Sequence, residues 1–289
     1  MRTFPPVAAI LLYGAVAGCG RAERLPPAQS DRAEAPQIPA PVAERRLAAT
    51  AGTVLEARLA GSQTHSYRID LAADQYADLT VDQRGVDVVV LLRSPDGSRL
   101  RRVDSLNGAH GPEPLPFIAG AAGGYRVEVR SSGAGAYAIV LAGLGAPTPR
   151  DRSRVAAEET FAAGEELRRQ GRDEALRKAV EQDLRALALF RSIGATGRQA
   201  DVLLSLGSAF SDLGEYLQAR GAYGRALDLY RAAGRTRQLP QALIGLGRAH
   251  RRLGETDEAL RCYREALSRS REAGSRWDEL ITLGNLGRV

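Results

Sequence analysis

Two stretches decide the fold of the C-terminal half: LGSAFSDLGEYLQARGAYGRAL at residues 206–227 and LGRAHRRLGETDEALRCYREAL at residues 246–267. They match at an offset of 40 residues in their glycines, in a tyrosine and in an alanine–leucine pair. The matched pairs are Leu206-Gly207 with Leu246-Gly247, Leu213-Gly214 with Leu253-Gly254, Tyr223 with Tyr263, Ala226-Leu227 with Ala266-Leu267, and Ala233-Gly234 with Ala273-Gly274. A fixed period of this length, with apolar residues at helical spacing, predicts stacked helical repeats.

The same period extends over residues 151–289, where proline almost disappears from the chain. Its members are a degenerate repeat at 155–196, repeats at 200–239 and 240–279, and an incomplete repeat at 280–289. The degenerate copy retains Ala163-Gly164, Gly171 and Gly194, with about three extra residues in its second helix. We therefore expect an all-α solenoid in this part of the chain.

The order of small and aromatic residues within one copy resembles the tetratricopeptide (TPR) repeat, in the longer kinesin-light-chain form. The residues that carry this resemblance are Leu206, Gly207, Phe210, Gly214, Ala219, Tyr223 and Ala226. The resemblance implies a concave surface, lined by the first helix of each repeat, that binds a protein or peptide. It points to Ser208, Arg248 and Arg288, and Arg252 lies one helical turn beyond Arg248 on the same face. The guanidinium groups of the three arginines would suit an acidic peptide or another carboxylate partner. The alternative is a solvated face of an arginine-rich protein.

The N-terminus has the pattern of an exported lipoprotein. A short apolar run at 7–17 leads to Val16-Ala17-Gly18-Cys19, which resembles the bacterial lipobox. This resemblance implies a signal peptide at 1–18, acylation of Cys19 and attachment to the cell envelope through a lipid anchor. Gly20 in place of aspartate favours the outer membrane if the source is a diderm bacterium. A proline-rich tether at 19–49 would follow.

Residues 50–146 carry short alternating segments, which predict strands of an antiparallel β-sandwich. The clearest are Leu55–Leu59, Tyr67–Leu71, Ala77–Val81, Val86–Leu92, Tyr125–Val129 and Tyr137–Leu141, with a turn at Ser94–Gly97. Their order resembles the bacterial pre-peptidase C-terminal (PPC) domain, a jelly-roll-like sandwich. This resemblance implies an accessory module of a secreted protein.

Composition and isolated polar residues argue against several other functions. The net charge is +6, but every basic residue except Lys178 is arginine, and no aromatic side chains alternate with the basic clusters. We therefore expect no nucleic-acid binding. Asp70, Asp74, Asp78 and Asp82 lack the glycine-rich loop of a calcium site, so they are expected to face solvent. His65 and His110 are expected at the surface, and His250 and Cys262 in repeat packing rather than catalysis. No catalytic residue, metal or cofactor is predicted.

The chain ends inside the first helix of a repeat, with Leu280, Ile281, Leu283 and Leu286 uncovered by a second helix. This end predicts either a fragment of a longer protein or a surface where another chain docks. The expected architecture is a multidomain protein, with an antiparallel β-sandwich followed by an all-α solenoid. Its expected function is a non-catalytic interaction scaffold. The alternative is the targeting or regulatory part of a larger CHAT-type cysteine peptidase, because the domain order resembles such proteins. The sequence leaves the oligomeric state open.

Overall fold

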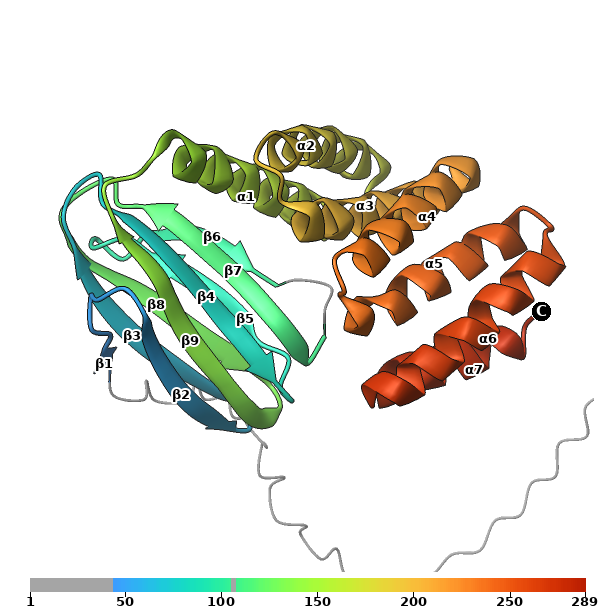
Figure 1. Ribbon diagram of the computed structural model, residues 1–289, viewed down its shortest axis with the longest axis horizontal. Helices are drawn as coiled ribbons and strands as arrows, with labels where there is room; N and C mark the ends of the chain where they lie inside the picture. Colours follow the sequence, from blue (N-terminus) through green and yellow to red (C-terminus); the bar gives the residue numbers. More distant parts are fainter. Residues whose placement is uncertain (1–43, 105–107) are drawn as a thin grey trace, which may run out of the picture. The chain divides into compact units, whose positions relative to one another are not determined.

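The computed structural model describes residues 44–104 and 108–289 (Figure 1). The expected signal peptide, the acylated Cys19 and the tether as far as residue 43 lie outside this part of the chain. The described residues form a two-sheet β-sandwich followed by seven α-helices. The multidomain fold class expected from the sequence is therefore confirmed.

The sandwich consists of a five-stranded sheet, in the order β1-β3-β8-β5-β6, and a four-stranded sheet, in the order β2-β9-β4-β7. All of its pairs are antiparallel except β1 with β3. The strands are β1 (Arg45–Arg46), β2 (Thr53–Ala60), β3 (Gln63–Leu71), β4 (Tyr76–Arg84), β5 (Val89–Arg93), β6 (Arg99–Val103), β7 (His110–Ile118), β8 (Gly123–Ser131) and β9 (Ala134–Gly145). Side chains at alternate positions fill the space between the sheets, as the period of two requires.

Three strands left no clear pattern in the sequence. β1 has two residues and lies, with the buried Leu47, inside the range assigned to the tether. β6 is largely polar, and β7 contains Pro112, Pro114 and Pro116. β7 pairs only with β4, at the edge of its sheet. An edge strand tolerates proline because the missing N–H groups can face away from the neighbouring strand.

The expectation that His65 lies at the surface is wrong. Its side chain is buried with an exposed fraction of 6%, and its Nδ1 atom lies 2.6 Å from the hydroxyl of Tyr137. That hydroxyl lies 2.6 Å from the hydroxyl of Tyr67. Burial, and secondarily the positive charge of Arg45, lowers the pKa of His65. His65 shares the inward face of β3 with Tyr67 and Ile69, because alternate residues of a strand face the same side.

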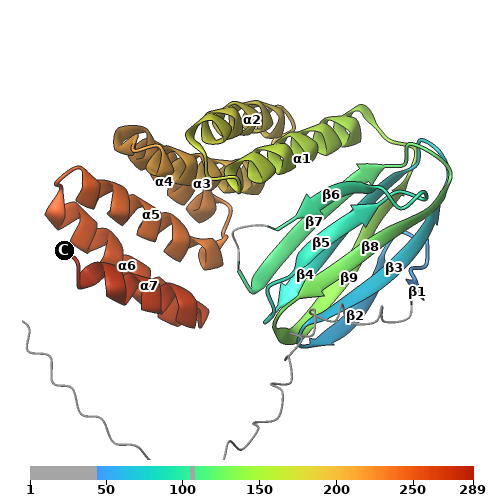
Figure 2. The same ribbon diagram turned by 180° about the vertical axis from the view of Figure 1, so that it is seen from behind.

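The helices follow one another in chain order in both views (Figure 1, Figure 2). They are α1 (Pro149–Arg168), α2 (Asp173–Ser192), α3 (Thr196–Asp212), α4 (Tyr216–Ala232), α5 (Leu239–Arg252), α6 (Thr256–Ala273) and α7 (Arg276–Leu286), with a short 3₁₀ turn, η1 (Thr236–Gln238), before α5. Gly214 and Gly254 have φ angles of 76° and 79° and make the tight turns within the two complete repeats. None of the helices in the described ranges is apolar over a length sufficient to cross a membrane.

Close contacts between a glycine and a large side chain join the two helices of a repeat. A Cβ atom added to Gly207 would lie 2.6 Å from the ring of Tyr223, and one added to Gly247 would lie 2.6 Å from the ring of Tyr263. In the degenerate repeat the corresponding glycine faces the carboxylate of Asp183 instead of a tyrosine. α2 has 20 residues and α4 has 17, in agreement with the extra residues expected in the second helix.

Candidate functional site: hollows along the first helices of the repeats

The first helices of the repeats, α3, α5 and α7, line two adjacent hollows. The larger, which we call the arginine hollow, has a volume of about 560 Å³. It is lined by Ser211, Asp212, Tyr216, Arg248, Arg251, Arg252, Leu280, Ile281, Gly284, Asn285 and Arg288. Four arginines and one acidic residue thus surround a single space. The hollow has a strongly positive lining.

The arginines of this hollow differ from most others on the helices in their electrostatic partners. Arg198, Arg231 and Arg235, for example, form ion pairs with neighbouring carboxylates. Within the described part of the chain, no arginine of the arginine hollow forms an ion pair. The Arg252 guanidinium lies over the ring of Tyr216, 5.7 Å from its centroid. Their charges are therefore available to an anion that enters the hollow.

Three polar atoms of the residues that line the hollow lack hydrogen-bond partners among the described residues: Nδ2 of Asn285, Oγ of Ser211 and Nε of Arg251. Asn285 has an exposed fraction of only 5%, so water reaches its side chain poorly. Buried polar groups in folded proteins are normally hydrogen-bonded, and an unpaired one is costly. The Asn285 amide can donate to a carboxylate, and the Ser211 hydroxyl can donate or accept. A polar ligand in the hollow would supply the hydrogen-bond partners that these two side chains lack.

The second hollow, which we call the apolar hollow, has a volume of about 250 Å³. It is lined by Leu204, Ser208, Tyr223, Gln241, Ile244, Arg248, Trp277, Asp278 and Ile281. Arg248 and Ile281 line both hollows, so the two are adjacent. Most of the lining is aliphatic or aromatic. The side chain of Trp277 has an exposed fraction of 72%.

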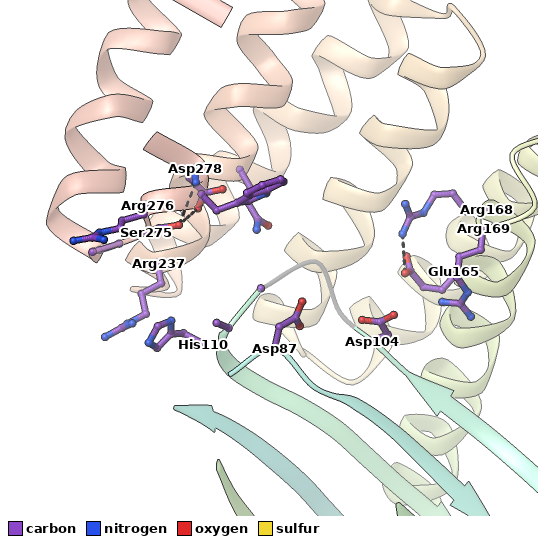
Figure 3. Close-up of a pocket in the computed structure, with 16 residues that line it drawn as sticks. Asp87, Asp104, His110, Glu165, Arg168, Arg169, Arg237, Ser275, Arg276 and Asp278 are labelled. Carbon is purple, nitrogen blue, oxygen red and sulfur yellow. Dashed lines mark hydrogen bonds and ion pairs between the residues drawn. The ribbon is translucent and has the colours of Figure 1, made fainter. Parts of the chain in front are cut away.

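A third hollow, of about 650 Å³, shares Gln241, Trp277 and Asp278 with the apolar hollow (Figure 3). Asp87, Asp104 and His110 contribute to it from the sandwich. The Arg168–Glu165 ion pair and the hydrogen bond between Ser275 and Asp278 are drawn in the same view. Its lining mixes acidic and basic groups in similar measure. No one ligand charge is therefore favoured there.

The residues selected from the sequence lie close together in the structure. Arg248, Arg252 and Arg288 line the arginine hollow, and Ser208 lines the apolar hollow beside Arg248. Partner binding by these four residues stays a prediction. The sequence analysis did not select Arg251, Asn285, Tyr216 or Trp277. Asn285 could have been noticed, because it follows Ser205 and Gly245 at the 40-residue offset and is the one amide at that position.

The four aspartates considered as a calcium site from the sequence are ion-paired in the structure. Asp70, Asp74, Asp78 and Asp82 each pair with an arginine rather than with one another. In the chain from residue 44 onward, residues 105–107 apart, no group of three acidic, histidine or cysteine side chains could hold a metal ion. The exposed His110 lines the third hollow.

His250 and Cys262 have the following surroundings in the structure. The Nδ1 atom of His250 lies 2.5 Å from a carboxylate oxygen of Glu255. Burial raises the pKa of the Cys262 thiol, which is the opposite of what thiolate chemistry requires. Cys262 is a free cysteine. The packing role expected of these two residues stays a prediction.

Comparisons with known proteins find similarities in both parts of the chain. Residues 238–289 match the family model of the tetratricopeptide repeat. Among solved structures, the chain is similar to the pre-peptidase C-terminal domain of a collagenase from Bacillus anthracis. The identity is 22%, the match covers 35% of this chain and 95% of that one, and the TM-score is 0.29. A search of the curated proteins gives no match.

The helices are similar to the TPR domain of Arabidopsis FLU, with 17% identity, coverage of 43% and 99%, and a TM-score of 0.39. They also resemble a TPR-like protein from Chlorobium tepidum, with 14% identity, coverage of 49% and 98%, and a TM-score of 0.41. At such identities the likeness concerns the fold alone. The match to the tetratricopeptide family model concerns residues 238–289.

Proposed function

We propose that this protein is a lipid-anchored scaffold of the bacterial cell envelope that binds an acidic segment of a partner protein in the arginine hollow. TPR repeats are protein-binding modules, which accounts for the scaffold role. One observation carries the acidic partner: Arg248, Arg251, Arg252 and Arg288 surround one space without ion pairs among the described residues.

The chemistry of the hollow matches a carboxylate ligand. A guanidinium group can donate two parallel hydrogen bonds to one carboxylate, and several such groups can hold neighbouring acidic side chains. The unpaired Nδ2 of Asn285 adds a donor that carries no charge. Asp212 also lines this hollow. Its negative charge repels a ligand carboxylate placed close to it, which limits where the carboxylates of the ligand can bind. A segment with two or more acidic side chains is the ligand that these groups fit.

Reversing two of these charges should abolish the interaction. We expect the double variant Arg248→Glu/Arg252→Glu to bind a fluorescein-labelled, end-blocked glutamate octapeptide at least 10-fold more weakly than the wild type. The reason is that two attractions become repulsions. Fluorescence anisotropy at low and high salt measures this, and wild-type binding should weaken as salt screens the charges.

The matched control is Arg225→Glu/Arg264→Glu. These arginines are exposed on the second helices α4 and α6, so the same change in net charge is made outside the hollow. If the control variant loses binding to the same degree, attraction to the overall positive charge explains the effect, and the hollow is not the site.

The lipid anchor rests on Val16-Ala17-Gly18-Cys19 and is tested separately. We expect Cys19→Ala to move the protein from the membrane fraction to the soluble fraction of its bacterial host, because the acceptor thiol for the lipid is lost. Cys262→Ala is the control, since Cys262 is the only other cysteine in the chain. Fractionation and metabolic labelling with a fatty-acid analogue report the outcome. A Cys19→Ala variant that stays in the membrane fraction or stays labelled contradicts the anchor.

A further inference from the structure

We infer that the acidic segment also carries a large apolar side chain, about three residues from its carboxylates, which is buried in the apolar hollow. This inference rests on the proposed function and specifies the partner further. One ligand would then fill both hollows, with its carboxylates in the arginine hollow and its apolar side chain in the apolar hollow. Such a ligand is recognised by more than its net negative charge.

The apolar hollow is suited to one aliphatic or aromatic side chain. Leu204, Ile244 and Ile281 present hydrocarbon to it, and the ring of Tyr223 completes this apolar surface. Tyr223 is held rigidly, because its ring lies against Gly207 and Gly245, where an added Cβ atom would come within 2.6 Å and 2.4 Å of it. The volume of about 250 Å³ exceeds that of one large side chain. A rigid apolar surface of this kind gains affinity by removing a ligand side chain from water.

The exposed Trp277 can cover such a side chain. Its exposed fraction of 72% is unusual for an indole, which is an amphipathic group that normally packs against other apolar atoms. Aromatic residues of this kind, beside a partly apolar hollow, are typical of sites that contribute most to a protein interface. Trp277 therefore belongs to the binding surface rather than to the core.

The spacing between the two groups of the ligand follows from α5. Ile244, Arg248 and Arg252 lie one helical turn apart on one side of this helix. The axial distance from Ile244 to the midpoint of the two arginines is about 9 Å at the α-helical rise of ~1.5 Å per residue. An extended peptide covers this distance in about three residues. Arg248 borders both hollows, so charge complementarity favours an anionic segment over an uncharged apolar one.

A direct test uses the single tryptophan of the chain as the reporter. The whole chain is titrated with end-blocked peptides that contain two glutamates and, three residues away in either direction, a leucine or a serine. A third peptide carries the leucine with glutamines in place of the glutamates. We expect the glutamate–leucine peptide, in one of its two orders, to bind about 10-fold more tightly than its serine counterpart. It should also shift the emission of Trp277 to shorter wavelength as the indole leaves water.

Two variants assign the effect to the apolar hollow. Ser208→Leu fills the hollow from α3, so it should remove the difference in affinity between the glutamate–leucine and the glutamate–serine peptide. Gln218→Leu introduces the same side chain at an exposed position on α4 and should leave the preference unchanged. Peptide binding to the variants is measured by anisotropy of labelled peptides, which does not depend on the tryptophan.

The possible results separate the two proposals. If the glutamate–leucine and glutamate–serine peptides bind equally well, this inference is wrong and the arginine hollow still stands. If the glutamine–leucine peptide binds as tightly as the glutamate–leucine peptide, the ligand needs no carboxylate beside its apolar group, and the inference is again wrong. If neither glutamate peptide binds, both the inference and the proposed function fail.

Discussion

Gly247→Val should lower the free energy of unfolding by about 3 kcal/mol, whereas Gly224→Val should change it by less than about 0.5 kcal/mol. Both glycines lie within helices of complete repeats. A Cβ atom at residue 247 would lie 2.6 Å from the ring of Tyr263, which is fully buried and cannot move aside. At residue 224 no heavy atom lies within 4 Å of the added Cβ, so only the small difference in helix propensity remains.

Chemical denaturation followed by circular dichroism measures both changes. The variant Tyr263→Ala supplies a third comparison, because it removes the ring that the valine would strike. Combined with Tyr263→Ala, Gly247→Val should cost clearly less than it does alone, which a double-mutant cycle quantifies. Equal losses for Gly247→Val and Gly224→Val would show that helix propensity, rather than the contact between α5 and α6, determines the result.

Asp183→Asn should stabilise the protein at pH 7 by about 1–3 kcal/mol. Asp183 is fully buried in α2, and the nearby Ser205 hydroxyl donates its hydrogen bond to Glu165 rather than to either Asp183 oxygen. Burial, and then the charge of Glu165, raises the pKa of Asp183 well above its usual value of 3.8. An asparagine removes the buried charge and can donate from its amide to a neighbouring carboxylate.

The stabilisation by Asp183→Asn should depend on pH. A carboxyl group whose pKa is raised by folding contributes its full stability below the unfolded value near 4 and loses it as pH rises through the folded value. The contribution of Asp183 to stability should therefore fall from about pH 4 toward neutral pH, and the stability gained by Asp183→Asn should grow over the same range. The Glu165 carboxylate that faces Asp183 is itself bonded to Arg168 and Ser205.

The control is Glu181→Gln, an exposed change of the same kind on the same helix. Thermal unfolding of the three proteins between pH 4 and pH 8 compares them. Parallel curves for the wild type and Asp183→Asn would mean that Asp183 is charged and solvated in the folded protein, against its buried position.

The repeats were predictable because packing between paired helices imposes a simple rule on the sequence. One helix needs a glycine where the other places a tyrosine, and this rule recurs as Gly207 with Tyr223 and Gly247 with Tyr263. The alternation of the inner β-strands was predictable for a similar reason, since burial on one face alone requires a period of two. β7 does not follow the second rule, because five consecutive residues, Glu113 to Phe117, are buried and two of them are prolines, which leaves its pattern ambiguous.

The candidate site was only partly predictable. The 40-residue offset places Arg248 and Arg288 at equivalent positions, so the sequence alone identified them as neighbours on successive first helices. Arg251 and Asn285 enter the same hollow through the packing of α5 and α7, and Tyr216 enters it from a second helix. Those contributions depend on the geometry between helices, which the period of a sequence does not specify.

The amino-acid sequence by itself determined the architecture, because helix and strand periods, turn glycines and the repeat offset are local properties that neighbouring residues impose. Only the tertiary structure decided which side chains lack partners. In the repeat alignment Asp183 is equivalent to Tyr223, one period later, and Asn285 is equivalent to Ser205, two periods earlier. Whether a buried group has a hydrogen-bond partner, however, depends on atoms from several helices at once. The physical reason is that hydrogen bonding and desolvation are set by three-dimensional neighbours, whereas periodicity records only which face of an element is buried.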